Sequence, residues 1–173
     1  MSIINLIKEE YNKFITENKS QSEFNWKQDI PNDVLSKMKI DGENIILYHY
    51  GTDKDTGYLD PYQAQSKTYT KDFEQWDQKR IFFYVNPIDK ERIVSGNEYI
   101  VEYPLNKLYP FNNDPFNFYD ICKKEFQEEG NIFNVNAQVR CIGNKVKESG
   151  FDGMIFKWGN TLRVDIWERV EVK

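Results

Sequence analysis

The stretch Leu47-Tyr48-His49-Tyr50-Gly51-Thr52 contains the one histidine of this 173-residue chain. Its residues are typical of a short apolar strand that runs into a glycine turn. A stretch of the same character, Arg80-Ile81-Phe82-Phe83-Tyr84-Val85-Asn86-Pro87, follows about thirty residues later and ends at a proline, which cannot continue a central ladder. If these strands are neighbours, His49 and Tyr84 form a small polar site on an apolar floor.

The pattern around these strands predicts an α+β fold with mixed, largely antiparallel sheets. Helical spacing of apolar residues predicts helices at 2–18, 33–38 and 137–148, the last closed by a left-handed glycine cap at Ser149-Gly150. Strands are expected at 45–50, 81–85 and 98–103, and a hairpin is expected from 153–158 and 162–172 around Gly159-Asn160. Segments 52–79 and 110–115 have the composition of loops.

The length of the chain allows one domain with one substantial core. We expect a helical arm at 1–40 and the main domain at 41–173, together forming a single compact unit. Aromatic residues make up 16% of the chain, so they carry much of the burial.

Composition also limits the partners and the compartment. No segment approaches the roughly 18 apolar residues of a membrane span, and the first ten residues lack the features of a signal peptide. The net charge is −5 without a Lys/Arg run, which disfavours indiscriminate binding to a nucleic-acid backbone. Cys122 and Cys141 are too few for a disulfide framework and form no CxxC pair. We therefore expect reduced thiols, Cys141 in the core, no zinc site and a cytoplasmic protein.

Five segments stand in a recognisable order, namely residues 47–61, 82–84, 99–104, 149–156 and 164–168. This order resembles the ADP-ribosyltransferase superfamily, in the branch whose signature is histidine, tyrosine and an acid, as in diphtheria-toxin-like and phage-borne members. The first two segments resemble its NAD-binding motifs, the third its following strand, and the last two its glycine–aromatic–Asp–Gly turn and closing strands. The resemblance covers residues 45–172 and implies an ADP-ribosyltransferase-like fold, a split β core with N-terminal helices.

The resemblance also implies that NAD is the co-substrate and gives roles to residues of the two motifs. His49 would hydrogen-bond the ribose beside the adenine. The backbone of Gly51 would hold the nicotinamide amide, since glycine lets a ligand approach the backbone closely. Tyr84 would stack on the nicotinamide ring. Tyr50 and Thr52 complete the NAD-binding motif around them.

Cleavage of NAD needs a carboxylate that stabilises the oxocarbenium-like ribose, and no metal. The family places this acid at or just before the start of a closing strand, where this chain reads Gly159-Asn160-Thr161-Leu162-Arg163. Asp165 and Glu168 are the nearest acids, on opposite faces of a regular strand, and Asp165 is favoured. The fork of donors on Arg80 suits a pyrophosphate, although a charged residue at a strand entry is usually only solvated.

Three functions stay open at this point. The first is an NAD-dependent ADP-ribosyltransferase, or an NAD glycohydrolase if water is the acceptor. Its acceptor, a protein, nucleic acid or small molecule, would be selected by the loops at 52–79 and 104–118. The absence of an acid at 160–163 favours the second, a catalytically inactive module of the same fold that binds a partner protein or a nucleotide. The third is an unrelated α+β interaction protein, in which His49 and Tyr84 are ordinary strand residues.

Overall fold

The computed structural model describes residues 25–26, 30, 32–51, 57–62, 80–87, 96–158 and 161–172. Its strands are β1 (Ile40–Asp41), β2 (Asn44–Gly51), β3 (Tyr58–Leu59), β4 (Ile81–Tyr84), β5 (Asn97–Pro104), β6 (Leu108–Pro110), β7 (Gly153–Trp158), β8 (Thr161–Ile166) and β9 (Val170–Glu171). Its helices are α3 (Asn32–Leu35), a 3₁₀ turn (Leu105–Lys107), α4 (Phe118–Glu128) and α5 (Val135–Glu148). The predicted α+β class is confirmed.

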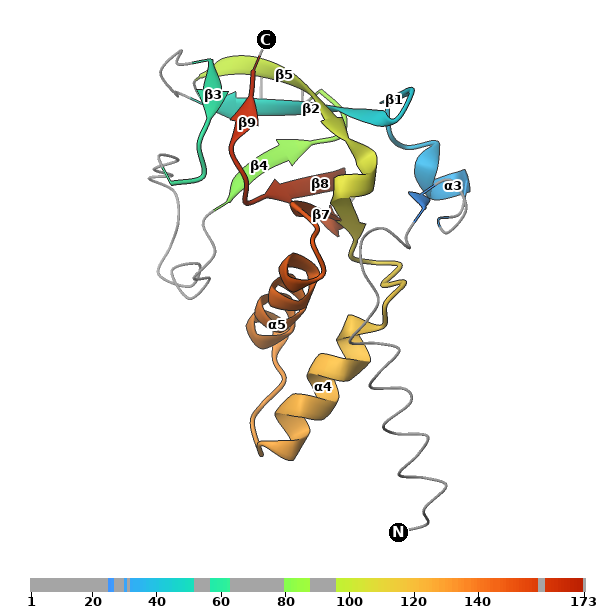
Figure 1. Cartoon of the computed structure of the whole chain (residues 1–173), viewed down its shortest axis with the longest axis vertical. Helices are drawn as coiled ribbons and strands as arrows, with labels where there is room; N and C mark the ends of the chain where they lie inside the picture. Colours follow the sequence, from blue (N-terminus) through green and yellow to red (C-terminus); the bar gives the residue numbers. More distant parts are fainter. Residues whose placement is uncertain are drawn as a thin grey trace.

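Seven of these strands form one curled, mostly antiparallel sheet (Figure 1). Their order is β5-β2-β4-β8-β7-β6, and β1 pairs with the start of β2. Among the described strands, β6 and β7 form the one parallel pair, and the connection between them contains α4 and α5. The two helices extend from the β6–β7 side of the sheet, and β3 pairs with β9 in a separate two-stranded ribbon.

The register gives the central strands β2, β4 and β8 two different faces. Tyr48 pairs with Tyr84, and Phe82 pairs with Asp165, so these side chains share one face, here called the Asp165 face. The alternate residues form the core face. Its buried side chains on these strands include Ile45, Leu47, Ile81, Phe83, Val164 and Ile166.

Most of the predicted elements are confirmed, with shifted ends. The strands expected at 45–50, 81–85 and 98–103 are β2, β4 and β5, and the helix expected at 137–148 is α5. Gly150 adopts the left-handed conformation expected of a cap, with φ +90°. The helix expected at 33–38 is shorter, because α3 ends at Leu35. The helix expected at 2–18 lies outside the described residues.

Two predictions on the second half of the chain need correction. The second hairpin strand was expected to extend to Val172, but β8 ends at Ile166. The chain then leaves the sheet, and β9 pairs with β3, which lies more than a hundred residues earlier in the sequence. The prediction also lacked α4, which lies between the 110–115 loop and α5.

The expectation of reduced thiols is wrong, because Cys122 of α4 and Cys141 of α5 form a disulfide. The two helices pack against each other and bring cysteines 19 residues apart in sequence to a Cα–Cα distance of 5.9 Å. That distance is within the range a disulfide needs. Cys122 is fully buried, and Cys141 packs against the edge of the core, as expected.

Part of the expected N-terminal arm packs on the main core. Trp26, Ile30 and Met38 are buried in the same apolar cluster as the sheet residues. The Trp26 indole Nε1 donates a hydrogen bond of 2.8 Å to the carbonyl of Leu108. These residues therefore belong to one compact unit with the sheet, while residues 1–24 lie outside the described part.

Candidate functional site

The site predicted from sequence lies where β2 and β4 separate, here called the fork. Strand β2 pairs with β5 over eight residues, but with β4 through one pair, Tyr48 with Tyr84. Beyond that pair, the Phe82 carbonyl lies 2.7 Å from the His49 imidazole Nδ1. The His49 side chain thus contacts the Phe82 carbonyl where a backbone hydrogen bond between β2 and β4 would otherwise form.

This contact assigns the tautomer of the neutral His49 ring. A carbonyl oxygen only accepts hydrogen bonds, so Nδ1 carries the proton and Nε2 is the acceptor of the neutral ring. The ring is half-buried and packs against Phe83 and Tyr99, with centroids 5.5 Å and 6.1 Å away. This hydrogen bond and the packing against Phe83 and Tyr99 hold the ring in its orientation.

The structure brings the strands of His49 and Tyr84 together but separates their side chains. His49 lies on the core face beside Phe83, whereas Tyr84 lies on the Asp165 face. The reason is a register offset of one residue, which changes the face of every side chain. A ligand that touched both residues would have to cross the open end of the fork.

On the Asp165 face, Tyr84 belongs to a group of aromatic and arginine side chains. Its ring lies 6.1 Å from that of Tyr50. The Arg163 guanidinium stacks over the rings of Phe82 and Tyr84, at 4.6 Å and 5.6 Å from their centroids. The Arg80 guanidinium lies 4.8 Å from the Phe82 centroid. Stacked guanidinium groups of this kind suit flat or anionic ligands.

Asp165 is fully buried beside this group. Its Oδ2 lies 2.8 Å from Arg80 Nε, but neither carboxylate oxygen has the geometry of a hydrogen bond, so the contact is a close ion pair without aligned N–H. Burial raises the pKa of the Asp165 carboxyl to about 7, because desolvation outweighs the lowering by Arg80 and Arg163. Asp165 is thus a buried carboxyl paired with Arg80, and it is not exposed to solvent.

The remaining predicted residues are spread around this region. Glu168 is exposed in the bend after β8, where its charge acts on Tyr103, away from the fork. Gly51 ends β2 and pairs with Asn97. Its backbone lies very close to Gly96: a Cβ added to Gly96 would be 2.6 Å from the Gly51 carbonyl oxygen. Thr52 lies outside the described residues.

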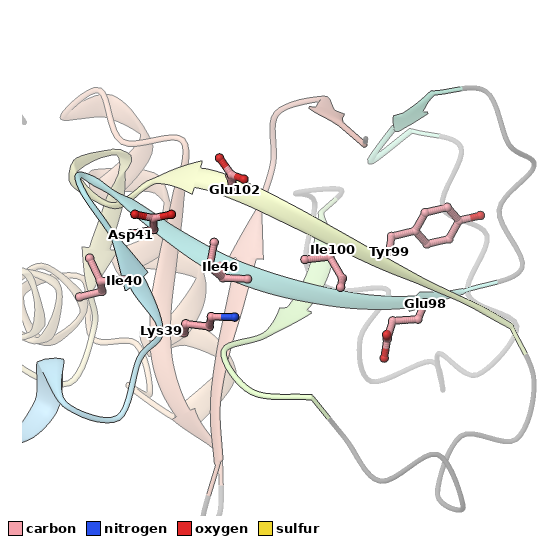
Figure 2. A pocket seen from close by; sticks show the side chains of 8 residues that line it. All are labelled: Lys39, Ile40, Asp41, Ile46, Glu98, Tyr99, Ile100 and Glu102. Carbon is pink, nitrogen blue, oxygen red and sulfur yellow. The ribbon is translucent and has the colours of Figure 1, made fainter.

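Sequence reasoning missed the residues of β5 that lie beside the predicted site. Tyr99 pairs with His49, and Glu98 pairs with Tyr50, which places an exposed carboxylate next to the Tyr50–Tyr84 pair. Both residues also line an open groove of about 690 Å³ along β1, β2 and β5, shown in Figure 2. The alternation in 97–104 indicates a strand but not its partner, so no local signal would have found them.

One other cluster has metal-ligand chemistry among the described residues. Cys122, Glu125 and Cys141 have their potential ligand atoms within 4.8 Å of one another. Both sulfur atoms belong to the disulfide and are therefore not thiolate ligands. Glu125 is engaged with Lys145, whose Nζ lies 2.7 Å from its Oε1.

Comparison of the chain with protein-family models, curated proteins and solved structures found no match. In the described part of the chain, no helix is both long and apolar enough to cross a bilayer.

Proposed function

We propose that this chain binds NAD at the fork and cleaves its nicotinamide–ribose bond, as an ADP-ribosyltransferase or an NAD glycohydrolase with a split β core. The observation that carries the proposal is the His49 imidazole, held by the Phe82 carbonyl where β2 and β4 separate. This contact orients Nε2 as an acceptor, and a ribose hydroxyl is a matching donor. The resemblance of the motifs around His49 and Tyr84 supports NAD as the ligand.

The side chains on the Asp165 face supply the other groups that NAD requires. Tyr84, next to Tyr50, offers a ring on which a nicotinamide stacks. The guanidinium of Arg80 matches a pyrophosphate, because its planar set of N–H donors can bind two phosphate oxygens at once. NAD would reach His49 and Tyr84 together by passing across the open end of the fork.

The ion pair of Arg80 and Asp165 gives this proposal a mechanism. A pyrophosphate competes with Asp165 for Arg80, and a carboxylate relieved of that arginine balances positive charge on the ribose. Nicotinamide leaves with the electron pair of the broken bond. An acceptor nucleophile, or water, gives an electron pair to the ribosyl carbon and releases its proton to solvent. The positive charge that faces Asp165 thereby changes from the guanidinium of Arg80 to the ribose of the substrate.

One observation favours a second candidate, a catalytically inactive module that binds a nucleotide. Asp165 is completely buried and paired with Arg80. A carboxyl that is protonated near neutral pH, or neutralised by an arginine, does not stabilise a cation on a ligand. If Arg80 does not release Asp165, the fork binds NAD and leaves it intact.

The test is incubation of the full chain with NAD, following nicotinamide by chromatography and unfolding by a thermal scan. At about a hundred times its dissociation constant, NAD should add roughly 2.7 kcal/mol, a rise in Tm of about 5–10 °C. His49→Phe keeps a ring against Phe83 and Tyr99 but loses both nitrogens, and should abolish the rise. Tyr84→Ala should do the same, whereas Tyr119→Ala, an exposed aromatic on α4, should not.

Asp165→Asn separates the two candidates. A transferase or glycohydrolase loses nicotinamide release in this variant and keeps the thermal shift. A nucleotide-binding module shows the shift without release in the wild type as well. No shift and no release from the wild type would contradict both.

A further inference from the structure

Helices α4 and α5 lie side by side (Figure 1), and their facing sides carry two sulfur atoms and a carboxylate. Cys122 and Glu125 are three residues apart on α4, and Cys141 and Lys145 are four apart on α5. Residues at these spacings share one face of a helix. The sulfur atoms of both cysteines and a carboxylate oxygen of Glu125 lie within 4.8 Å of one another. The fold thus gathers ligand chemistry that forms no metal motif in the sequence.

The distances in this group suit a single tetrahedral metal ion. The Sγ atom of Cys141 lies 3.7 Å from Oε2 of Glu125. A thiolate sulfur and a carboxylate oxygen bound to one zinc ion lie roughly 3.5 Å apart, given bond lengths of about 2.3 and 2.0 Å. Two thiolate sulfurs on the same ion lie roughly 3.8 Å apart. Once the disulfide is open, rotation of the side chains provides that separation across the Cα–Cα distance of 5.9 Å.

The pairing of Glu125 with Lys145 is part of this arrangement. The Lys145 ammonium lies 2.7 Å from Oε1 of Glu125, while the other oxygen, Oε2, is the one near the sulfur. A carboxylate that binds a metal usually has such an outer partner, which orients it. Two thiolates and the carboxylate carry three negative charges, and a divalent ion together with Lys145 balances them. The lysine therefore neutralises the site and leaves one oxygen for the metal.

We propose that reduction of the bond between Cys122 and Cys141 converts this group into a Zn²⁺ site. Its ligands are the two thiolates and Oε2 of Glu125, with water in the fourth position. Thiolate ligands select zinc over magnesium or calcium, which prefer oxygen. Glu125 is exposed, so water reaches the open position. This site is independent of NAD.

The reductant is a dithiol, and its attack falls on Cys141, because Cys122 is fully buried and Cys141 only partly so. A thiolate of the dithiol bonds to the sulfur of Cys141, and Cys122 leaves as a thiolate. The second thiol of the reductant then displaces Cys141. The dithiol becomes a disulfide, having supplied two electrons and two protons, and zinc binding releases the protons from the cysteines.

The test is an anaerobic titration of the reduced full chain with Co²⁺, a coloured substitute for zinc. We expect a thiolate-to-cobalt charge-transfer band and the intense visible bands of tetrahedral cobalt, both abolished when zinc displaces it. The oxidised chain has the same sequence but no thiolate, and should show neither. Zinc at about a hundred times its dissociation constant should raise the Tm of the reduced chain by about 5–10 °C.

The variant Glu125→Gln should weaken cobalt binding by at least about tenfold, since loss of even an outer partner typically costs that much. The control is Glu128→Gln, which removes another lysine-paired carboxylate from α4, 3.9 Å from Lys124, and should leave binding unchanged. Absence of the thiolate band from the reduced wild type would overturn the proposal, as would equal affinity of Glu125→Gln and the wild type. If reduction unfolds the chain, zinc should refold it, because binding is then coupled to folding. Failure to refold would overturn the proposal as well.

Discussion

The disulfide between Cys122 and Cys141 gives a stability prediction whose size follows from the chain length it closes. The bond joins residues 19 apart in sequence. For a loop of that length, the loss of chain entropy in the unfolded state corresponds to about 3 kcal/mol at 25 °C. Replacing both cysteines by alanine should lower the free energy of unfolding by about this amount, because each substitution removes a single sulfur atom, from the buried Cys122 and from the partly buried Cys141.

The assay is urea unfolding of the oxidised wild type, the reduced wild type and Cys122→Ala/Cys141→Ala. The reduced wild type is the matched control, since it lacks the bond but keeps both side chains. Both bond-free forms should lose about 3 kcal/mol, a fall in Tm of roughly 6–12 °C for a chain of this size. Their m-values should rise, because an uncrosslinked unfolded chain exposes more surface.

Thiol titration of the denatured protein provides the independent check. Neither cysteine is free in the structure, so the untreated protein should show no reactive thiol, and the reduced protein two. Two thiols before reduction would show that the bond is absent. A bond that is present but whose loss leaves the urea midpoint unchanged would refute the entropic reasoning.

Three further predictions concern other parts of the fold. The Asp165 carboxyl ionises near 3.8 when unfolded but near 7 when folded, so the free energy of unfolding should fall as pH rises through this window, by up to about 4 kcal/mol. Urea midpoints from pH 4 to 8 should show this slope in the wild type and a smaller one in Asp165→Asn; parallel slopes would contradict it. Gly96 has φ +131° and no room for a Cβ, so Gly96→Ala should cost more than the roughly 1–2 kcal/mol expected for Gly130→Ala, which is left-handed but open. Equal thermal midpoints of these two variants would disprove the close approach at Gly51. Trp26→Phe leaves the buried Leu108 carbonyl without its donor and should cost about 1–3 kcal/mol in chemical unfolding; an unchanged value would show that Trp26 does not anchor its segment to the sheet.

The strands were predictable from sequence because their signal is local. Strands β2, β4 and β5 are rich in aromatic and β-branched residues, and turn residues or proline bound them. Helix α4 was missed because its start has no local signature. It begins after Asn117 in a left-handed conformation, and its first amides, those of Phe118 and Tyr119, donate to the side chain of Asp114 four and five residues earlier.

Much of the candidate site depends on pairing, which sequence patterns do not encode. The prediction that β2 and β4 are neighbours is confirmed by the Tyr48–Tyr84 pair. The same pair places the side chains of His49 and Tyr84 on opposite faces of the sheet. A register shifted by one residue would have placed them on the same face. The disulfide, the partner of Asp165 and the position of Glu98 likewise come from contacts between distant segments. Whether these residues bind NAD stays a prediction.

The sheet order has a consequence for how the protein is made. The second partner of β4 is β8, and paired residues such as Tyr84 and Arg163 are 79 positions apart. At about 5–20 residues per second, a ribosome needs roughly 4–16 s to synthesise that interval. During this time the strand that becomes the middle of the sheet has one open edge in a nascent chain. Protection by a chaperone would matter most in that interval, and slowing translation after β4 should lower the soluble yield.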